Sequence, residues 1–456
     1  MPTNPSHFDR VRLAHLAERE RLAFAERHPR SARAHRQAGH LFGGVPMTWM
    51  NKIATGFPLY VERARGARLT DLDGPEYVDV CLGDTGARAG HAPEPVVAAV
   101  TRRLSGLGGA TTMLPTTDAA AAGAELSRRF GLPYWSFALT ATDANRWAIR
   151  LLRAVTGRPK ILVNSYCYHG SVDESLIVAG PDGRGRSRPG NVGAPTDVTT
   201  TSRVAEFNDL AGLERELAHS DVAAVLMEPA LTNIGIVLPE PGYLDGVRDL
   251  TRRYGTYLIN DETHTFSAGP GGATAAWGLA PDVVTIGKAI AGGIPAGAYG
   301  LSAELAKALN NRADLDLIDM GGVGGTLAGN PVSMAATRAC LTEVLTDAAF
   351  VGMIETATAF ADGLREIIDG YALPWSTVQL GARVEYRFAS PAPRTGTESA
   401  ASADAELADF LHAYLVNRGV LLTPFHNMAL MSPVTTADDV ARHHTVFQAA
   451  LAELVA

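Results

Sequence analysis

The sequence contains few cysteines, and they lie far apart. Cys81, Cys167 and Cys340 are the only three in 456 residues. An odd number at such wide spacing argues against a disulfide framework, so we expect a reducing compartment. Neither a His-Glu-x-x-His motif nor a pair of closely spaced cysteines occurs, so no metal site is expected. The adjacent histidines at 443–444 fall in a polar segment that predicts an exposed helix.

Long apolar runs are also absent from the sequence. No stretch of about 18 apolar residues occurs, which argues against a membrane-spanning helix. The first residues contain no apolar signal core, so we predict a cytoplasmic protein without membrane attachment. The formal net charge of -8 argues against nucleic-acid binding.

The common nucleotide-binding motifs are missing as well. Lys288 lacks the Gly-x4-Gly-Lys-Ser/Thr setting of a phosphate loop, and no strand leads into a Gly-x-Gly-x-x-Gly turn. A nucleotide-binding protein, or a purely structural α/β protein, therefore remains only as an alternative to the enzyme that the rest of the sequence indicates.

The middle of the chain alternates short apolar runs with amphipathic segments. Apolar runs without polar alternation suit strands that are covered on both faces, as in a parallel sheet flanked by helices. We therefore predict a doubly wound α/β domain over about residues 75–315. The predicted strands are 135–139, 160–163, 222–227, 256–260 and 282–287, and the predicted helices include 143–155 and 242–255.

The two ends of the chain have different patterns. Residues 7–38 mix both charge signs and predict an amphipathic helix that packs on the body or on a partner subunit. Residues 382–388 alternate strictly, which predicts a half-buried antiparallel strand, and a helix is expected from Asp404. A smaller α+β domain should therefore follow the large one. The segment 180–197 is rich in Gly, Pro and Arg and predicts a surface loop.

Three chemically useful groups follow three predicted strands. Open parallel sheets bind ligands beyond the carboxyl ends of their strands, so these groups should lie close together. The turn at 140–144 opens a helix whose backbone N–H groups could hold a phosphate. Asp261 at a buried strand end needs a cationic partner, although it could also cap a helix.

The third group is Lys288, which lies in the Gly-rich segment 285–300. A desolvated amine there would act as a nucleophile toward carbonyls, although a lysine among glycines is more often an ordinary loop residue. A phosphate, a buried cation and a carbonyl occur together in pyridoxal 5'-phosphate, whose ring nitrogen would face Asp261 and whose aldehyde would form a Schiff base with Lys288.

The ordered motifs resemble one enzyme family over most of the chain. The similarity is to class III pyridoxal-phosphate-dependent aminotransferases, closest to the glutamate-1-semialdehyde 2,1-aminomutase-like branch. It implies fold type I, with an N-terminal helix and segment at 1–74, a large cofactor-binding domain at 75–315, and an interface loop and small domain at 316–456. The matching segments are 71–100, 140–145, 167–174, 227–265, 281–300 and 324–331.

The resemblance also implies roles for single residues. Lys288 would carry the cofactor and shuttle the proton, and Asp261 would keep the ring nitrogen protonated. Tyr168 would stack on the ring unless it is a core aromatic, and Glu228 is either a ring neighbour or a structural acid. Because family active sites lie at a homodimer interface, Thr326 would reach the neighbouring subunit's phosphate. The other implied cofactor contacts are Ala141, Thr142, His169, Asn233 and Thr263.

One departure from the family pattern bears on the substrate. Relatives that bind a substrate carboxylate often carry an arginine in the segment 43–59, where this chain has Trp49 and Met50. Bidentate carboxylate recognition needs arginine, so we expect an apolar or aromatic pocket here, or ordinary packing. The leading interpretation is an aminotransferase that acts on an amine or amino acid and a keto acid or aldehyde. The alternative is an aminomutase, an isomerase with the same site.

Overall fold

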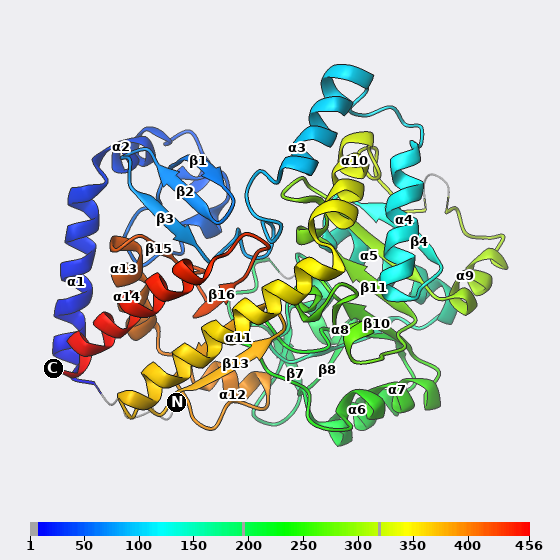
Figure 1. Ribbon diagram of the computed structural model, residues 1–456. Coiled ribbons are helices and arrows are strands. Elements are labelled where there is room, and N and C mark those ends of the chain that lie inside the picture. The colour runs from blue at the N-terminus through cyan, green and yellow to red at the C-terminus, as the bar shows by residue number, and fades with distance from the viewer. Residues whose placement is uncertain (1–7, 194–196, 318–320) are drawn as a thin grey trace. The chain divides into compact units, whose positions relative to one another are not determined.

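The computed structural model describes residues 8–193, 197–317 and 321–456 (Figure 1). The chain divides into two units, which are described separately below. The first comprises Met1–Ala92, Val351–Ala392 and Ser402–Ala456, and the second comprises Pro93–Phe350 and Pro393–Ala401. The domain boundaries expected from the sequence remain a prediction.

The second unit is built on a seven-stranded sheet with the strand order β4-β12-β11-β10-β9-β5-β8. Neighbours from β8 to β11 run parallel, whereas β12 is antiparallel to both β11 and β4. The sheet is therefore mostly parallel, as predicted. Its strands are β4 (Tyr134–Ala138), β5 (Lys160–Asn164), β8 (Ser202–Ala205), β9 (Val222–Met227), β10 (Tyr257–Asp261), β11 (Val283–Ile286) and β12 (Gly297–Leu301).

Helix α5 (Ala141–Thr156) packs on the middle of this sheet, against β9, β11 and β12. Its amphipathic sequence buries Ala144, Ala148 and Leu152, and Gly157 ends it in a left-handed conformation. Apolar side chains of α5 and of the parallel strands form one core. The other helices of the unit are α3 (Glu94–Thr101), α4 (Thr117–Phe130), α6 (Leu210–Leu217), α7 (Tyr243–Arg253), α8 (Gly272–Ala276), α9 (Ala303–Asn310), α10 (Pro331–Ala339) and α12 (Gly396–Ala401).

The segment 180–197 is more ordered than the loop expected from its composition. It contains β7 (Gly185–Ser187), which pairs antiparallel with the mostly buried β6 (Ile177–Ala179). The composition of 180–197 alone does not predict this exposed strand. The strand forms because β6, which lies just before the segment, pairs with it. Residues 194–196 lie outside the described residues.

The first unit contains two small sheets. One has the order β1-β2-β3-β15 and the other the order β13-β14-β16. Their strands are β1 (Val61–Arg65), β2 (Arg68–Asp71), β3 (Glu76–Asp79), β13 (Ser376–Leu380), β14 (Arg383–Arg387), β15 (Val420–Leu421) and β16 (Met428–Leu430). The helices are α1 (Arg10–Arg27), α2 (Pro29–Gln37), α13 (Ala405–Asn417) and α14 (Ala437–Val455), together with most of α11 (Asp347–Gly370).

Two sequence predictions for this unit were wrong. Strand β14 is antiparallel as expected, but all five of its residues are buried. It is the central strand of its sheet, and Tyr386 stacks on Trp375 on its apolar face. His443 is also fully buried, because it lies between Phe360 and Phe447 instead of facing solvent.

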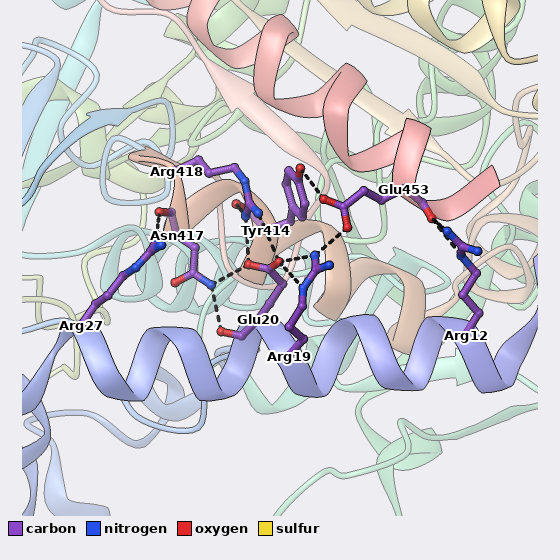
Figure 2. Close-up of polar contacts among 8 residues, drawn as sticks. All are labelled: Arg12, Arg19, Glu20, Arg27, Tyr414, Asn417, Arg418 and Glu453. Atoms are coloured by element: carbon purple, nitrogen blue, oxygen red, sulfur yellow. Dashed lines mark hydrogen bonds and ion pairs between the residues drawn. The ribbon is translucent and has the colours of Figure 1, made fainter. Parts of the chain in front are cut away.

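Helix α1 is joined to α13 and α14 of its own unit by a polar network (Figure 2). The centre of the network is Glu20, which is only 3% exposed. Its carboxylate accepts hydrogen bonds from Arg19, Asn417 and Arg418. The Arg418 guanidinium also covers the Tyr414 ring, 3.3 Å from its centroid. The N-terminal helix thus packs on its own unit through a buried carboxylate and the partly exposed donors around it.

We expect Glu20→Ala to lower the free energy of unfolding by about 1–3 kcal/mol, because it removes the buried acceptor that three partly exposed donors share. Chemical denaturation of the full chain would measure the loss. Glu18→Ala is the matched control on the same helix, because Glu18 is exposed and pairs with Arg21 in solvent. Equal losses in the two variants would contradict a stabilising role for the network.

Within the described residues, no single helix has the length and apolar character needed to cross a membrane. One bent pair, Pro331–Val344 with Asp347–Gly370, meets that requirement only when the two helices are taken together, and by length and composition alone.

Candidate active site

Lys288 follows the end of β11 and begins a 3-10 turn, η7 (Lys288–Ala291). Its backbone has φ +49°, a left-handed conformation that costs energy for a residue with a side chain. Such strain is common at functional sites because the surrounding fold imposes it. The Lys288 amine is half-buried, and its Nζ lies 2.9 Å from Nε2 of His264.

Asp261 is the last residue of β10, next to β11 in the sheet. Its Oδ2 accepts hydrogen bonds from His169 Nδ1 at 2.9 Å and from Asn145 Nδ2 at 2.8 Å. Its Oδ1 accepts from the backbone N–H of Thr263 at 3.0 Å. Thr285 on β11 donates to Asn145 Oδ1 at 2.6 Å and so fixes the orientation of the amide. The carboxylate is therefore held in one orientation by His169, by Asn145 of α5 and by the backbone of Thr263.

This environment keeps the buried Asp261 ionised. Burial alone would raise its pKa, but the hydrogen bond and charge of His169, with the Thr263 and Asn145 donors, hold the pKa below its usual range. A carboxylate has about four lone-pair positions. Three are used here, so Asp261 can accept one more hydrogen bond from a cationic N–H.

The start of α5 and two glycines form the third part of the site. Helix α5 is capped by the Thr140 hydroxyl, which accepts from the backbone N–H of Asp143. A Cβ atom at Gly170, which has φ +78°, would lie 2.0 Å from Thr142 Oγ1. One at Gly287 would lie 2.8 Å from the Ala141 nitrogen. Only glycine lets the backbone at 170 and 287 come this close to the start of α5. The first N–H groups of the helix and these two glycines therefore surround a small space suited to a phosphate.

An aromatic residue was also predicted to lie at the cofactor ring. Tyr168 is 40% exposed and is therefore not a core aromatic, and its stacking on the ring stays a prediction. Together, the residues of the site fit pyridoxal phosphate.

Three further residues were predicted to contact the cofactor. Glu228 follows β9, is buried, and accepts a hydrogen bond from the Thr232 hydroxyl. Asn233 is half-buried and forms an isolated bridge with Gly235. Thr326 is exposed in a turn before α10. Their roles at the cofactor stay predictions.

Trp49 and Met50 lie in the first unit, on the 3-10 turn η2 (Thr48–Asn51). They line a cavity of about 350 Å³ whose walls are mostly apolar, with Lys52 and His412 among the polar lining residues. Burial lowers the pKa of His412 to about 4, so this imidazole is neutral at pH 7. Trp49 also contacts Phe425 edge-to-face, with the ring centroids 6.3 Å apart. The apolar character predicted for this segment is present in the cavity.

The sequence interpretation missed three residues of the site. Asn145 and Thr285 support Asp261, and His264 contacts the Lys288 amine. Thr285 is the one polar residue in the apolar run of β11, which is a detectable signal. His264 lies three residues after Asp261 at the same strand end, which could also have marked it.

Known proteins match this chain over most of its length. A family model described as aminotransferase class-III matches residues 49–451. The glutamate-1-semialdehyde 2,1-aminomutase of Chloroflexus aggregans is 35% identical over 414 residues, which cover 88% of this chain and 92% of the relative. The enzyme of the same name from Anaeromyxobacter dehalogenans is 33% identical over 407 residues, or 87% and 91% of the two chains.

Solved structures give the same result. A glutamate-1-semialdehyde-aminomutase from Pseudomonas aeruginosa PAO1 is 46% identical, with a TM-score of 0.96 over 98% of this chain and 100% of that one. A variant of it has been solved in complex with PMP. An omega-transaminase from Sphaerobacter thermophilus is 29% identical, with a TM-score of 0.85 over 95% and 100% of the two chains.

The mostly parallel sheet, with a lysine and an aspartate following adjacent strands, defines a pyridoxal-phosphate-dependent enzyme of fold type I. The chain belongs to the class-III aminotransferase family. The resemblance, the fold class and the cofactor predicted from the sequence are confirmed. The family includes transaminases and aminomutases, so membership alone does not choose between the two reactions.

Proposed function

We propose that this enzyme is an aminomutase, an isomerase that moves an amino group between two carbons of one substrate molecule. The substrate class is a 2-amino aldehyde of the glutamate-1-semialdehyde type. The observation that carries the proposal is the 46% identity over nearly the whole chain to the Pseudomonas aeruginosa aminomutase. It favours the isomerase over the transaminase that the sequence made the leading interpretation.

The residues of the site suit this reaction. Bound pyridoxal phosphate supplies an electron sink for the pair left when a substrate C–H bond breaks. The ionised Asp261 would hold a proton on the ring nitrogen, and the first N–H groups of α5 would bind the phosphate. The Lys288 amine would act as general base and acid, moving the proton between a substrate carbon and the cofactor carbon that shares the amine nitrogen.

A transaminase is the second candidate, and the apolar residues of the segment 43–59 favour it. Trp49 and Met50 stand where relatives that bind a carboxylate often carry arginine, and methionine adapts to irregular shapes. Such a transaminase would take an amino donor with an apolar or aromatic group, and its acceptor would be a keto acid or aldehyde. In both versions we propose a cytoplasmic homodimer in which Thr326 reaches the partner's cofactor.

Supplying one substrate at a time separates the two reactions. The full-length holoenzyme is incubated with glutamate 1-semialdehyde alone, and the isomer with its amine on carbon 1 is measured by mass spectrometry. Sustained formation of that isomer without an added acceptor supports the aminomutase. Turnover that needs a separate keto acid or aldehyde, and prefers apolar amines to the semialdehyde, would overturn it in favour of the transaminase.

A further inference from the structure

His264 is placed at the reacting amine by the fold. It lies three residues beyond the end of β10, where it precedes the turn η6 (Thr265–Ala268). Its Nε2 lies 2.9 Å from Lys288 Nζ, and both side chains are half-buried. The two residues come from neighbouring strand ends and are 24 positions apart in sequence, so their contact depends on the parallel pairing of β10 with β11.

The other titratable side chains in the segment Asp261–His264 are directed elsewhere. Asp261 binds His169 and Asn145. Glu262 accepts hydrogen bonds from the Thr265 hydroxyl and from the backbone N–H groups of Ala273 and Thr274. Within this segment, His264 is therefore the side chain in contact with the lysine amine.

We propose that His264 is a positioning residue for Lys288, whose amine donates a hydrogen bond to the imidazole Nε2. The inference rests on one part of the proposed function, namely that Lys288 transfers the proton. When Lys288 removes a proton, the substrate C–H bond breaks, its electron pair stays with the substrate, and the proton binds Nζ. The resulting ammonium keeps its hydrogen bond to Nε2 until it returns the proton to carbon.

This contact has two expected consequences. A hydrogen bond to a charged group is stronger than one between neutral groups, so Nε2 stabilises the ammonium more than the amine. It also fixes the direction of a flexible side chain whose misplacement would slow proton transfer. His264 should therefore affect the rate of proton transfer more than the binding of substrate.

Two substitutions and a control test the proposal. His264→Met removes the acceptor at similar length, whereas His264→Gln keeps an amide oxygen that can accept from Nζ. His219→Met is the control, because His219 is an exposed histidine of the same unit. We expect His264→Met to lower kcat about tenfold to a hundredfold. His264→Gln should restore most of the rate, and KM should change by less than about twofold in both.

A second measurement does not depend on turnover. Cofactor is removed from the full-length protein, pyridoxal phosphate is added, and the covalent product at Lys288 is trapped with borohydride and quantified by peptide mass. His264→Met should form this product several-fold more slowly than His264→Gln and His219→Met, because its amine is less well oriented.

The outcomes separate this inference from the proposed function. Both candidate reactions begin with proton removal by Lys288, so a transaminase result leaves the comparison of variants valid. If wild-type protein turned over neither substrate class, the proposed function would fail while the trapping rates still tested His264. Equal kcat values and equal trapping rates for His264→Met and His264→Gln would overturn the positioning role. An effect on KM alone would do the same.

Discussion

Lys288→Ala is expected to abolish turnover and to remove the covalently bound chromophore, while the protein remains folded. The variant deletes the amine that bonds to the cofactor and moves the proton. Loss of a positioned general base alone costs about 10²–10⁴ in rate, and loss of the covalent link adds to this. The measurements are kcat and the visible absorption of protein dialysed against cofactor-free buffer.

The fold should tolerate this change. Lys288 has φ +49°, which alanine adopts about as readily as lysine, and its amine is only half-buried. Lys307→Ala on α9 is the control, because Lys307 is an exposed lysine of the same unit. If Lys288→Ala instead kept a visible band after dialysis, and borohydride reduction then left the cofactor permanently bonded to the protein, another residue would carry the cofactor.

The sequence predicted the main catalytic pair because its signals are local. Asp261 and Lys288 each follow an uninterrupted apolar run, and such runs predict buried parallel strands. Parallel strands bring their carboxyl ends to one edge of the sheet, so the pair could be placed without coordinates. The structure confirms that β10 and β11 are parallel neighbours.

The supporting residues could not be predicted in this way. Asn145 reaches Asp261 across 116 positions and accepts from Thr285 across 140. Such contacts depend on how α5 lies on the sheet, which periodicity does not determine. His264 was missed for a similar reason, because its side-chain direction depends on the turn after β10.

The wrong predictions share a physical cause. The alternation in β14 was interpreted as one buried and one exposed face, but both faces are buried. Arg383 on its polar face donates to Thr85 Oγ1 at 2.6 Å, so a charged side chain is accommodated inside the unit. Periodicity detects polarity and not burial, and a buried polar face with hydrogen-bond partners looks the same in sequence as a solvated one.

Asp261→Asn is expected to lower kcat about a hundredfold to several thousandfold, because it removes the buried charge that the site is built to hold. The amide has nearly the shape of the carboxylate, so the packing should survive. The neutral amide can no longer compensate the positive charge of a protonated ring nitrogen. Its NH2 group is also a donor, which would face the Asn145 and His169 donors. The measurements are kcat, the visible spectrum of the holoenzyme and the free energy of unfolding.

The pH dependence of stability gives an independent check. The pKa of Asp261 is lowered on folding, so its stabilising contribution is complete at neutral pH and is lost as the pH falls through the lowered value. The unfolding free energy of Asp261→Asn should lack the part that is lost at low pH. The control Asp249→Asn should retain that part, because Asp249 is exposed on α7. If Asp261→Asn kept both the wild-type rate and the wild-type acid profile, the carboxylate would have no charged partner at the site. The His169 and Asn145 contacts orient this negative charge. That result would mean that binding of the cofactor at this strand end does not depend on the charge.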